Sequence, residues 1–143
     1  IELTVLLVFL IGSVIIIQCC SKHYFGRPRP IYIKEFGGNL IFSPAFKVSN
    51  ECKYNCSFVS FHTSIGLLFF FHSLGSASAK KYFMIFASCL LTLILGLTRI
   101  IQGNHFLSDV IIAACFMTII YYLITTSLAY IVKKKYDTVQ IVS

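Results

Sequence analysis

Hydrophobic residues form four long runs separated by polar segments. The runs cover about residues 3–20, 59–74, 82–101 and 105–132. An α-helix rises about 1.5 Å per residue, so about 20 apolar residues cross a hydrocarbon core of about 30 Å. Inside a bilayer a helix satisfies its own backbone hydrogen bonds. The pattern therefore predicts an all-α fold, an integral membrane bundle with four transmembrane helices in one domain over residues 1–143.

The polar segments define the two membrane faces of this bundle. The longest, residues 21–58, follows the first run and holds all three prolines. Because successive membrane helices alternate in direction, this segment lies on the same side as the start of the second run, the end of the third and the start of the fourth. We call this side X and the opposite side Y. Three lysines at 133–135 are predicted to end the fourth run on side Y.

Composition agrees with a membrane protein and narrows its chemistry. Hydrophobic residues make up 57% of the chain and charged residues 12%, against about 25% charged in a typical soluble domain. Only five residues are acidic, which disfavours paired-carboxylate glycosidases and oxygen-ligated two-metal sites. The net charge of +7 favours anionic partners. Because most basic residues lie between the apolar runs, a phosphorylated or anionic lipid fits better than nucleic acid.

Basic residues and cysteines bear on orientation. Side X carries seven basic residues, and these are Lys22, Arg27, Arg29, Lys34, Lys47, Lys53 and Arg99. Taken alone, this count would make side X cytoplasmic. Without Lys22, Arg29 and Arg99, which are site candidates, four remain against five on side Y, so the count favours side X as extracytoplasmic. Cys52 and Cys56 on side X either form a disulfide in an oxidising compartment or remain two thiols.

Ionisable residues inside or beside apolar runs are costly and usually functional. They are His62, His72, Arg99, His105 and Asp109, of which all but His72 fall on side X. His105 and Asp109 are four residues apart, so they share a helix face. A carboxylate beside one imidazole nitrogen stabilises the protonated ring and directs the other nitrogen outward as a base or nucleophile. The alternative is an ion pair at a helix start with no chemical role.

Further polar groups join this pair on side X. Lys22 and Arg29 follow the first run, Ser60 and His62 begin the second, and Arg99 ends the third. Arginine and lysine match the charge of a tetrahedral phosphate, and arginine can bind two of its oxygens. One histidine can attack phosphorus while the other protonates the leaving group. Cationic side chains can neutralise the developing charge, so neither a metal nor another cofactor is expected. Arg27 is interpreted as a second headgroup contact or an interfacial cation.

In order and spacing, these residues resemble the three-part signature of the phosphatidic acid phosphatase type 2 superfamily, which includes vanadium haloperoxidases and bacterial acid phosphatases. The parts are Lys22 with six residues to Arg29-Pro30, then Ser60-Phe61-His62, then Arg99 with five residues to His105 and three to Asp109. The stretches 103–109 and 57–62 are most similar to the bacterial membrane branch that includes lipid A 1-phosphatases.

The resemblance implies a role for each residue of a membrane phosphatase-like domain. His105 would attack phosphorus and form a phosphohistidine, Asp109 would orient His105, and His62 would protonate the leaving oxygen and then activate water. The groups that would hold the phosphate oxygens are Lys22, Arg29, Arg99, the Ser60 hydroxyl and the backbone N–H of Phe61. The substrate would be a phosphomonoester or pyrophosphate on a lipid headgroup, hydrolysed without metal.

The resemblance also implies a location. In bacterial lipid phosphatases of this family the site faces the extracytoplasmic side of the inner membrane. The family bundle usually has six helices, so two helices upstream of the four predicted here are expected to be missing from this chain.

Phe61 departs from the family pattern, in which the second motif reads Pro-Ser-Gly-His. Glycine allows a backbone N–H to approach a phosphate closely. Phe61 keeps the N–H but adds a ring that either enters the pocket and blocks substrate or turns toward the lipid. An inactive or truncated family member is therefore one alternative. Another is a non-catalytic membrane subunit that binds lipid or haem through its histidines, although His62 and His105 both lie at the X end and not near mid-membrane.

Overall fold

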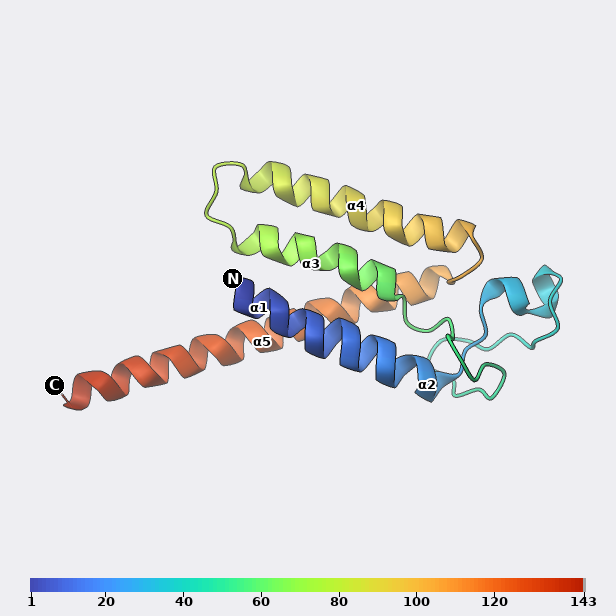
Figure 1. Ribbon diagram of the computed structural model, residues 1–143, viewed down its shortest axis with the longest axis horizontal. Helices are drawn as coiled ribbons and strands as arrows, with labels where there is room; N and C mark the ends of the chain where they lie inside the picture. Colours follow the sequence, from blue (N-terminus) through green and yellow to red (C-terminus); the bar gives the residue numbers. More distant parts are fainter. Residues whose placement is uncertain (143) are drawn as a thin grey trace.

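The computed structural model describes residues 1–142, which form helices joined by one long loop and two short connections (Figure 1). These described residues contain no β-strand, only an isolated bridge between Ile33 and Leu40. The predicted all-α class is confirmed. Among the same residues, three helical segments are long and apolar enough to cross a membrane, namely Glu2–Tyr32, Lys81–Ile101 and Leu107–Gln140.

The first run forms one continuous rod, made of α1 (Glu2–Leu7), the π-helical segment η1 (Val8–Ser21) and α2 (Lys22–Phe25). It ends at Gly26, whose φ of 54° lies in the left-handed region. A Cβ at this glycine would lie 2.0 Å from the Ser49 carbonyl oxygen. The predicted end at residue 20 is therefore wrong, because the chain stays helical through Lys22 until Gly26 stops it.

The second and third runs form an antiparallel helix pair, α3 (Phe61–Gly75) and α4 (Lys81–Ile101) (Figure 1). Ser60 is the extended residue that precedes α3. With 15 residues, α3 is shorter than the helices that pass the spanning criterion. A typical bilayer core needs about 20 helical residues. A membrane crossing by α3, which would bring the number of transmembrane helices to four, therefore stays a prediction.

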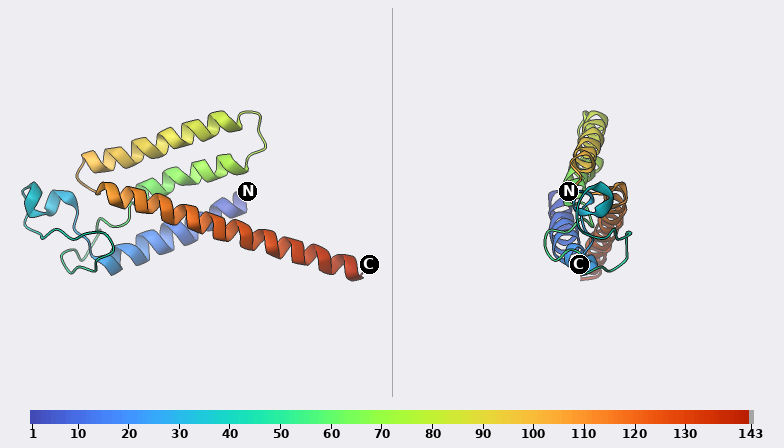
Figure 2. Two further views of the ribbon diagram at one scale, coloured as in Figure 1. Left: turned by 180° about the vertical axis from the view of Figure 1, so that it is seen from behind. Right: turned by 90° about the vertical axis from the view of Figure 1, so that its right-hand side faces the viewer.

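The last helix, α5 (Leu107–Val142), is 36 residues long and extends beyond the rest of the bundle (Figure 2). The prediction that the lysines at 133–135 end it is wrong, because the helix continues through them. Lysine is a good helix former, and neither glycine nor proline follows these lysines to stop the helix.

Four helix ends meet at one end of the bundle: the end of α2 and the start of α3, with the end of α4 and the start of α5 (Figure 1). The loop over residues 26–60 lies at this end. The hydrophobic core beneath it draws on the first rod, this loop, α3 and α5, and its buried members are Val8, Ile17, Phe58, Val59, Phe71, Ala113 and Met117. The fold thus gathers the X-side segments above a common core.

Close approach of α3 and α4 depends on Gly66. A Cβ at this position would lie 2.8 Å from both Cα and Oγ1 of Thr92, and small residues at such contacts let membrane helices pack closely. We expect Gly66→Val to destabilise the protein by about 1–3 kcal/mol through overpacking, seen as a lower thermal unfolding midpoint in detergent. Ala87→Val is the matched control, because Ala87 is exposed on α4. Equal midpoints for the two variants would contradict this packing argument.

Candidate active site

The ionisable residues predicted for side X come together where the four helix ends meet. Lys22 lies in α2, His62 in the first turn of α3, Arg99 in the last turn of α4, and His105 just before α5. His62 interacts electrostatically with Arg99, His105, Lys22 and Arg29. Groups from four separate chain segments therefore share one polar site, as the spacing of the motifs predicted.

The Asp109 carboxylate is the centre of the hydrogen bonding at this site and is fully buried. Its Oδ1 accepts a hydrogen bond of 2.5 Å from Nη1 of Arg27. Its Oδ2 accepts one of 2.5 Å from the Ser57 hydroxyl and one of 2.9 Å from the Phe106 backbone N–H. His105 Nδ1 lies 3.7 Å from Oδ2, which is ion-pair range but beyond a hydrogen bond. Asp109 is thus held in place by groups other than the histidine it faces.

Arg27 has a role that the sequence interpretation missed. Its side chain is 3% exposed, so it is neither a headgroup contact nor an interfacial cation. Besides Asp109, it donates to the Ser43 carbonyl at 2.8 Å and to the Ser108 hydroxyl at 2.9 Å. Its guanidinium carbon lies 4.1 Å from the centre of the Phe106 ring. Arg27 therefore neutralises the buried carboxylate and ties the long loop to the start of α5.

Ser57 is the second missed residue. In addition to its bond to Asp109, its hydroxyl lies 3.3 Å from the Asn104 carbonyl, and its backbone N–H donates to the Arg27 carbonyl at 2.8 Å. The signal for both residues is indirect: a buried Asp109 needs a cation and donors, but the sequence does not show which of the loop residues supply them.

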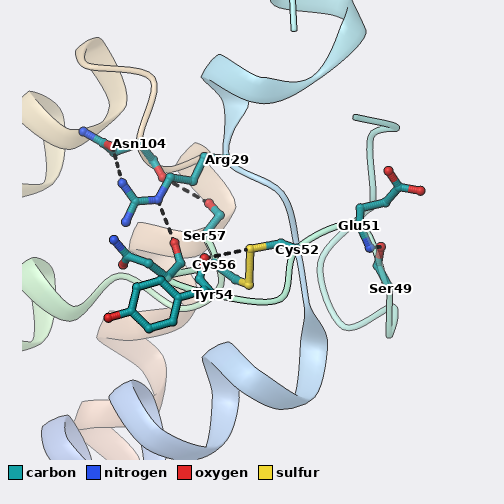
Figure 3. Close-up of a disulfide and its surroundings, with 9 residues drawn as sticks. Arg29, Ser49, Glu51, Cys52, Tyr54, Cys56, Ser57 and Asn104 are labelled. Atoms are coloured by element: carbon teal, nitrogen blue, oxygen red, sulfur yellow. Dashed lines mark hydrogen bonds between the residues drawn. A yellow bond between two sulfur atoms is a disulfide. The ribbon is translucent and has the colours of Figure 1, made fainter. Parts of the chain in front are cut away.

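A disulfide closes the segment just before Ser57 (Figure 3). Of the two alternatives for Cys52 and Cys56, the structure has the disulfide. Arg29 lies against this closed segment, donating through Nε to the Asn55 carbonyl at 2.9 Å and through Nη1 to the Asn104 side chain at 2.6 Å (Figure 3). The disulfide loop therefore helps to fix the position of one of the predicted phosphate ligands.

His62 and Arg99 are in direct contact, with Nη2 of Arg99 against Nε2 of His62. Arg99 also donates through Nη1 to the Gln102 side chain at 2.9 Å. Among the described residues, Nδ1 of His62 and Nδ1 of His105 are buried without a hydrogen-bond partner. The predicted proton donor thus lies beside a predicted phosphate ligand, as a shared substrate would require.

Ser60 and Phe61 occupy the start of α3. The Ser60 backbone N–H donates to the Asp109 carbonyl at 3.3 Å, and its buried hydroxyl accepts from Thr63 Oγ1 at 3.0 Å. The Phe61 ring is half-buried, packs against the hydrophobic core and meets the His62 ring edge-on at a centroid distance of 6.3 Å. The ring is therefore part of the packing that supports the helix start.

Comparison with known proteins identifies the class. The model of the PAP2 superfamily matches residues 3–133, and the chain belongs to this superfamily, whose signature its three motifs resemble. Curated relatives are named lipid A 4′-phosphatase. The protein of Francisella tularensis subsp. novicida (strain U112) is 39% identical over 110 residues, which cover 76% of this chain and 50% of that protein. No solved structure matches the chain.

Two further relatives carry the same name. The Rhizobium leguminosarum protein is 33% identical over 103 residues, covering 72% of this chain and 44% of its own length. The Rhizobium etli (strain ATCC 51251) protein is 33% identical over 101 residues, covering 71% and 39%. This chain thus spans half or less of these relatives. The expected superfamily and lipid A phosphatase branch are confirmed, although the names of the relatives specify the 4′-phosphate and not the 1-phosphate.

The buried pair of Arg27 and Asp109 generates a stability prediction. Arg27→Met leaves the carboxylate buried without its cation, and breaking a buried ion pair costs about 3–5 kcal/mol. We expect a marked fall in the thermal unfolding midpoint in detergent. Lys34→Met is the control, since Lys34 is exposed in the same loop. If Arg27→Met unfolds at the same temperature as this control, the buried pair does not hold the loop to α5.

Proposed function

We propose that this chain is a membrane lipid phosphatase that hydrolyses a phosphomonoester or pyrophosphate on a lipid headgroup, without metal, through a phosphohistidine. The observation that carries the proposal is the convergence on His62 of three cations and a second histidine, His105, which faces a buried carboxylate. Membership of the PAP2 superfamily supports it. From the names of the relatives, we propose lipid A as the substrate.

In the proposed first step, Nε2 of His105 attacks phosphorus and the bond from phosphorus to the lipid oxygen breaks. His62 gives its proton to that oxygen, so the lipid leaves as an alcohol. In the second step His62 takes a proton from water, the hydroxide attacks phosphorus, and the bond to His105 breaks to release inorganic phosphate. Asp109 stabilises the positive ring of His105 during both steps, since its Oδ2 lies 3.7 Å from Nδ1.

Lys22, Arg29 and Arg99 would hold the phosphate oxygens, together with the Ser60 hydroxyl and the Phe61 backbone N–H. The start of α3 suits this role because the first N–H groups of a helix attract anions. Packing of the Phe61 ring on the hydrophobic core supports an active protein over a damaged copy, because this contact directs the ring toward the core.

The proposed setting is the bacterial inner membrane, with four transmembrane helices in this chain and the site on the extracytoplasmic face. In this arrangement α3 crosses the membrane in addition to the three longer helical segments, and it pairs with α4. The disulfide between Cys52 and Cys56 supports the extracytoplasmic face, because such bonds persist in oxidising compartments.

The nucleophile can be tested by trapping. We expect acid quenching during turnover of a lipid with radiolabelled phosphate to yield an acid-labile phosphoprotein in the parent protein and none in His105→Ala. Asp109→Asn should keep weaker turnover because the nucleophile remains. His72→Ala is the matched control, since His72 is exposed on α3 away from the site. Label retained by His105→Ala would refute the assignment, and loss of turnover in excess chelator would refute the metal-free mechanism.

Orientation gives a separate prediction. We expect single cysteines at Lys34→Cys and Lys47→Cys to react with an impermeant maleimide from outside the cell, and Lys134→Cys only after the inner face is opened. All three lysines are exposed. The background replaces Cys19, Cys20, Cys89 and Cys115 by serine and keeps the disulfide. Reaction of Lys34→Cys only from the cytoplasmic side would overturn the extracytoplasmic site.

A further inference from the structure

A polar cavity of about 210 Å³ lies between the end of the first rod and the disulfide loop. Its lining residues are Gln18, Lys22, His23, Lys53, Tyr54, Asn55 and Cys56. Only Lys22 among them has a role in the reaction proposed above. The cavity is therefore a feature that the hydrolysis of a single phosphate group does not explain.

The chemistry of the lining favours an anion. Lys22, Lys53 and His23 line the cavity, and no carboxylate is found among its described lining residues. His23 donates from Nδ1 to the Cys19 carbonyl at 2.8 Å, so Nε2 is the ring nitrogen left for a ligand, and it donates to an anion when the ring carries both protons. Gln18, Tyr54 and Asn55 also line the cavity and carry neutral hydrogen-bond donors. Such a set of donors matches the oxygens of a phosphate.

The cavity adjoins the candidate active site on two sides. Lys22 is 7% exposed and interacts electrostatically with both Arg29 and Arg99. Arg29 in turn donates to the carbonyl of Asn55, a lining residue. One ligand could therefore place one group at the phosphate site and another in the cavity.

The wall that carries Lys53, Tyr54 and Asn55 is cross-linked. All three residues lie inside the ring closed by Cys52 and Cys56, and Cys52 Sγ lies 3.3 Å from the Tyr54 carbonyl (Figure 3). A wall ordered before binding loses less conformational entropy when the ligand arrives. The disulfide thus supports a binding role for a loop whose side chains are otherwise exposed.

We infer that this cavity binds a second phosphate-type anion on the headgroup of the same substrate molecule. One phosphate is hydrolysed at His105 while Lys53 and His23 hold the other, so the preferred substrate is a lipid with two anionic groups on its headgroup. The identity of the group that is hydrolysed rests on the proposed function. The binding role of the cavity is a separate assignment and is tested separately.

The test compares two synthetic lipids with the same acyl chains. One carries a single phosphomonoester, and the other carries in addition a phosphonate that cannot leave. We expect Lys53→Gln and His23→Gln each to raise KM for the two-anion lipid about tenfold, the loss expected for one charge-assisted hydrogen bond, with kcat unchanged. KM for the single phosphomonoester should stay within about two-fold, as should both values in the control Lys47→Gln, an exposed lysine outside the cavity.

The other results separate failure of the cavity assignment from failure of the proposed function. An equal rise in KM for both lipids, or no rise for the two-anion lipid, contradicts the second anion site. If inorganic phosphate added to the single phosphomonoester lowers its KM in a Lys53-dependent way, the cavity takes a separate ion and not a group of the substrate. If the parent protein hydrolyses neither lipid, the proposed function fails, and calorimetric binding decides the cavity: a Lys53-dependent preference for the two-anion lipid supports it, and equal binding refutes it.

Discussion

Burial of the Asp109 carboxylate is the constraint on which this end of the molecule depends. A charge removed from water must be paired and hydrogen-bonded, or the fold loses several kcal/mol. Arg27 and Ser57 from the loop supply these partners, together with the Phe106 backbone N–H. The Asp109 carbonyl also accepts from the N–H of Ser60 at the start of α3. The hydrogen bonds that satisfy this one residue therefore also dock the loop and fix the entry into α3.

The sequence predicted those parts of the site that lie in local patterns. The four-residue spacing of His105 and Asp109, and the motifs around Lys22, His62 and Arg99, sit at the ends of apolar runs whose length and order dictate which ends meet. Helix limits were predicted less well where they depend on single residues. The first rod continues through Lys22 to Gly26. The end of an apolar run marks where polar side chains begin, but a polar side chain does not by itself end a helix.

The loop chemistry could not be predicted in this way. Arg27 and Asp109 are 82 positions apart in the sequence, and Ser57 and Asp109 are 52 apart. No periodicity connects such pairs, and the loop over residues 26–60 offers two arginines and four serines among which the sequence does not choose. The spacing of Cys52 and Cys56 likewise allowed both a disulfide and two thiols. Only the three-dimensional path of the loop distinguishes these choices.

Pairing within the site also determines which charges remain for a ligand. Because Arg27 is committed to Asp109 in a buried pair, that carboxylate does not offset the other cations. Lys22, Arg29 and Arg99 interact electrostatically around His62, so three cations gather at this end of the bundle while the buried carboxylate beside them is paired with Arg27. A phosphomonoester carries about −1.5 to −2 charge near neutral pH, whereas a carboxylate carries one. The pairing that stabilises the fold therefore also favours a phosphate over a carboxylate at this site.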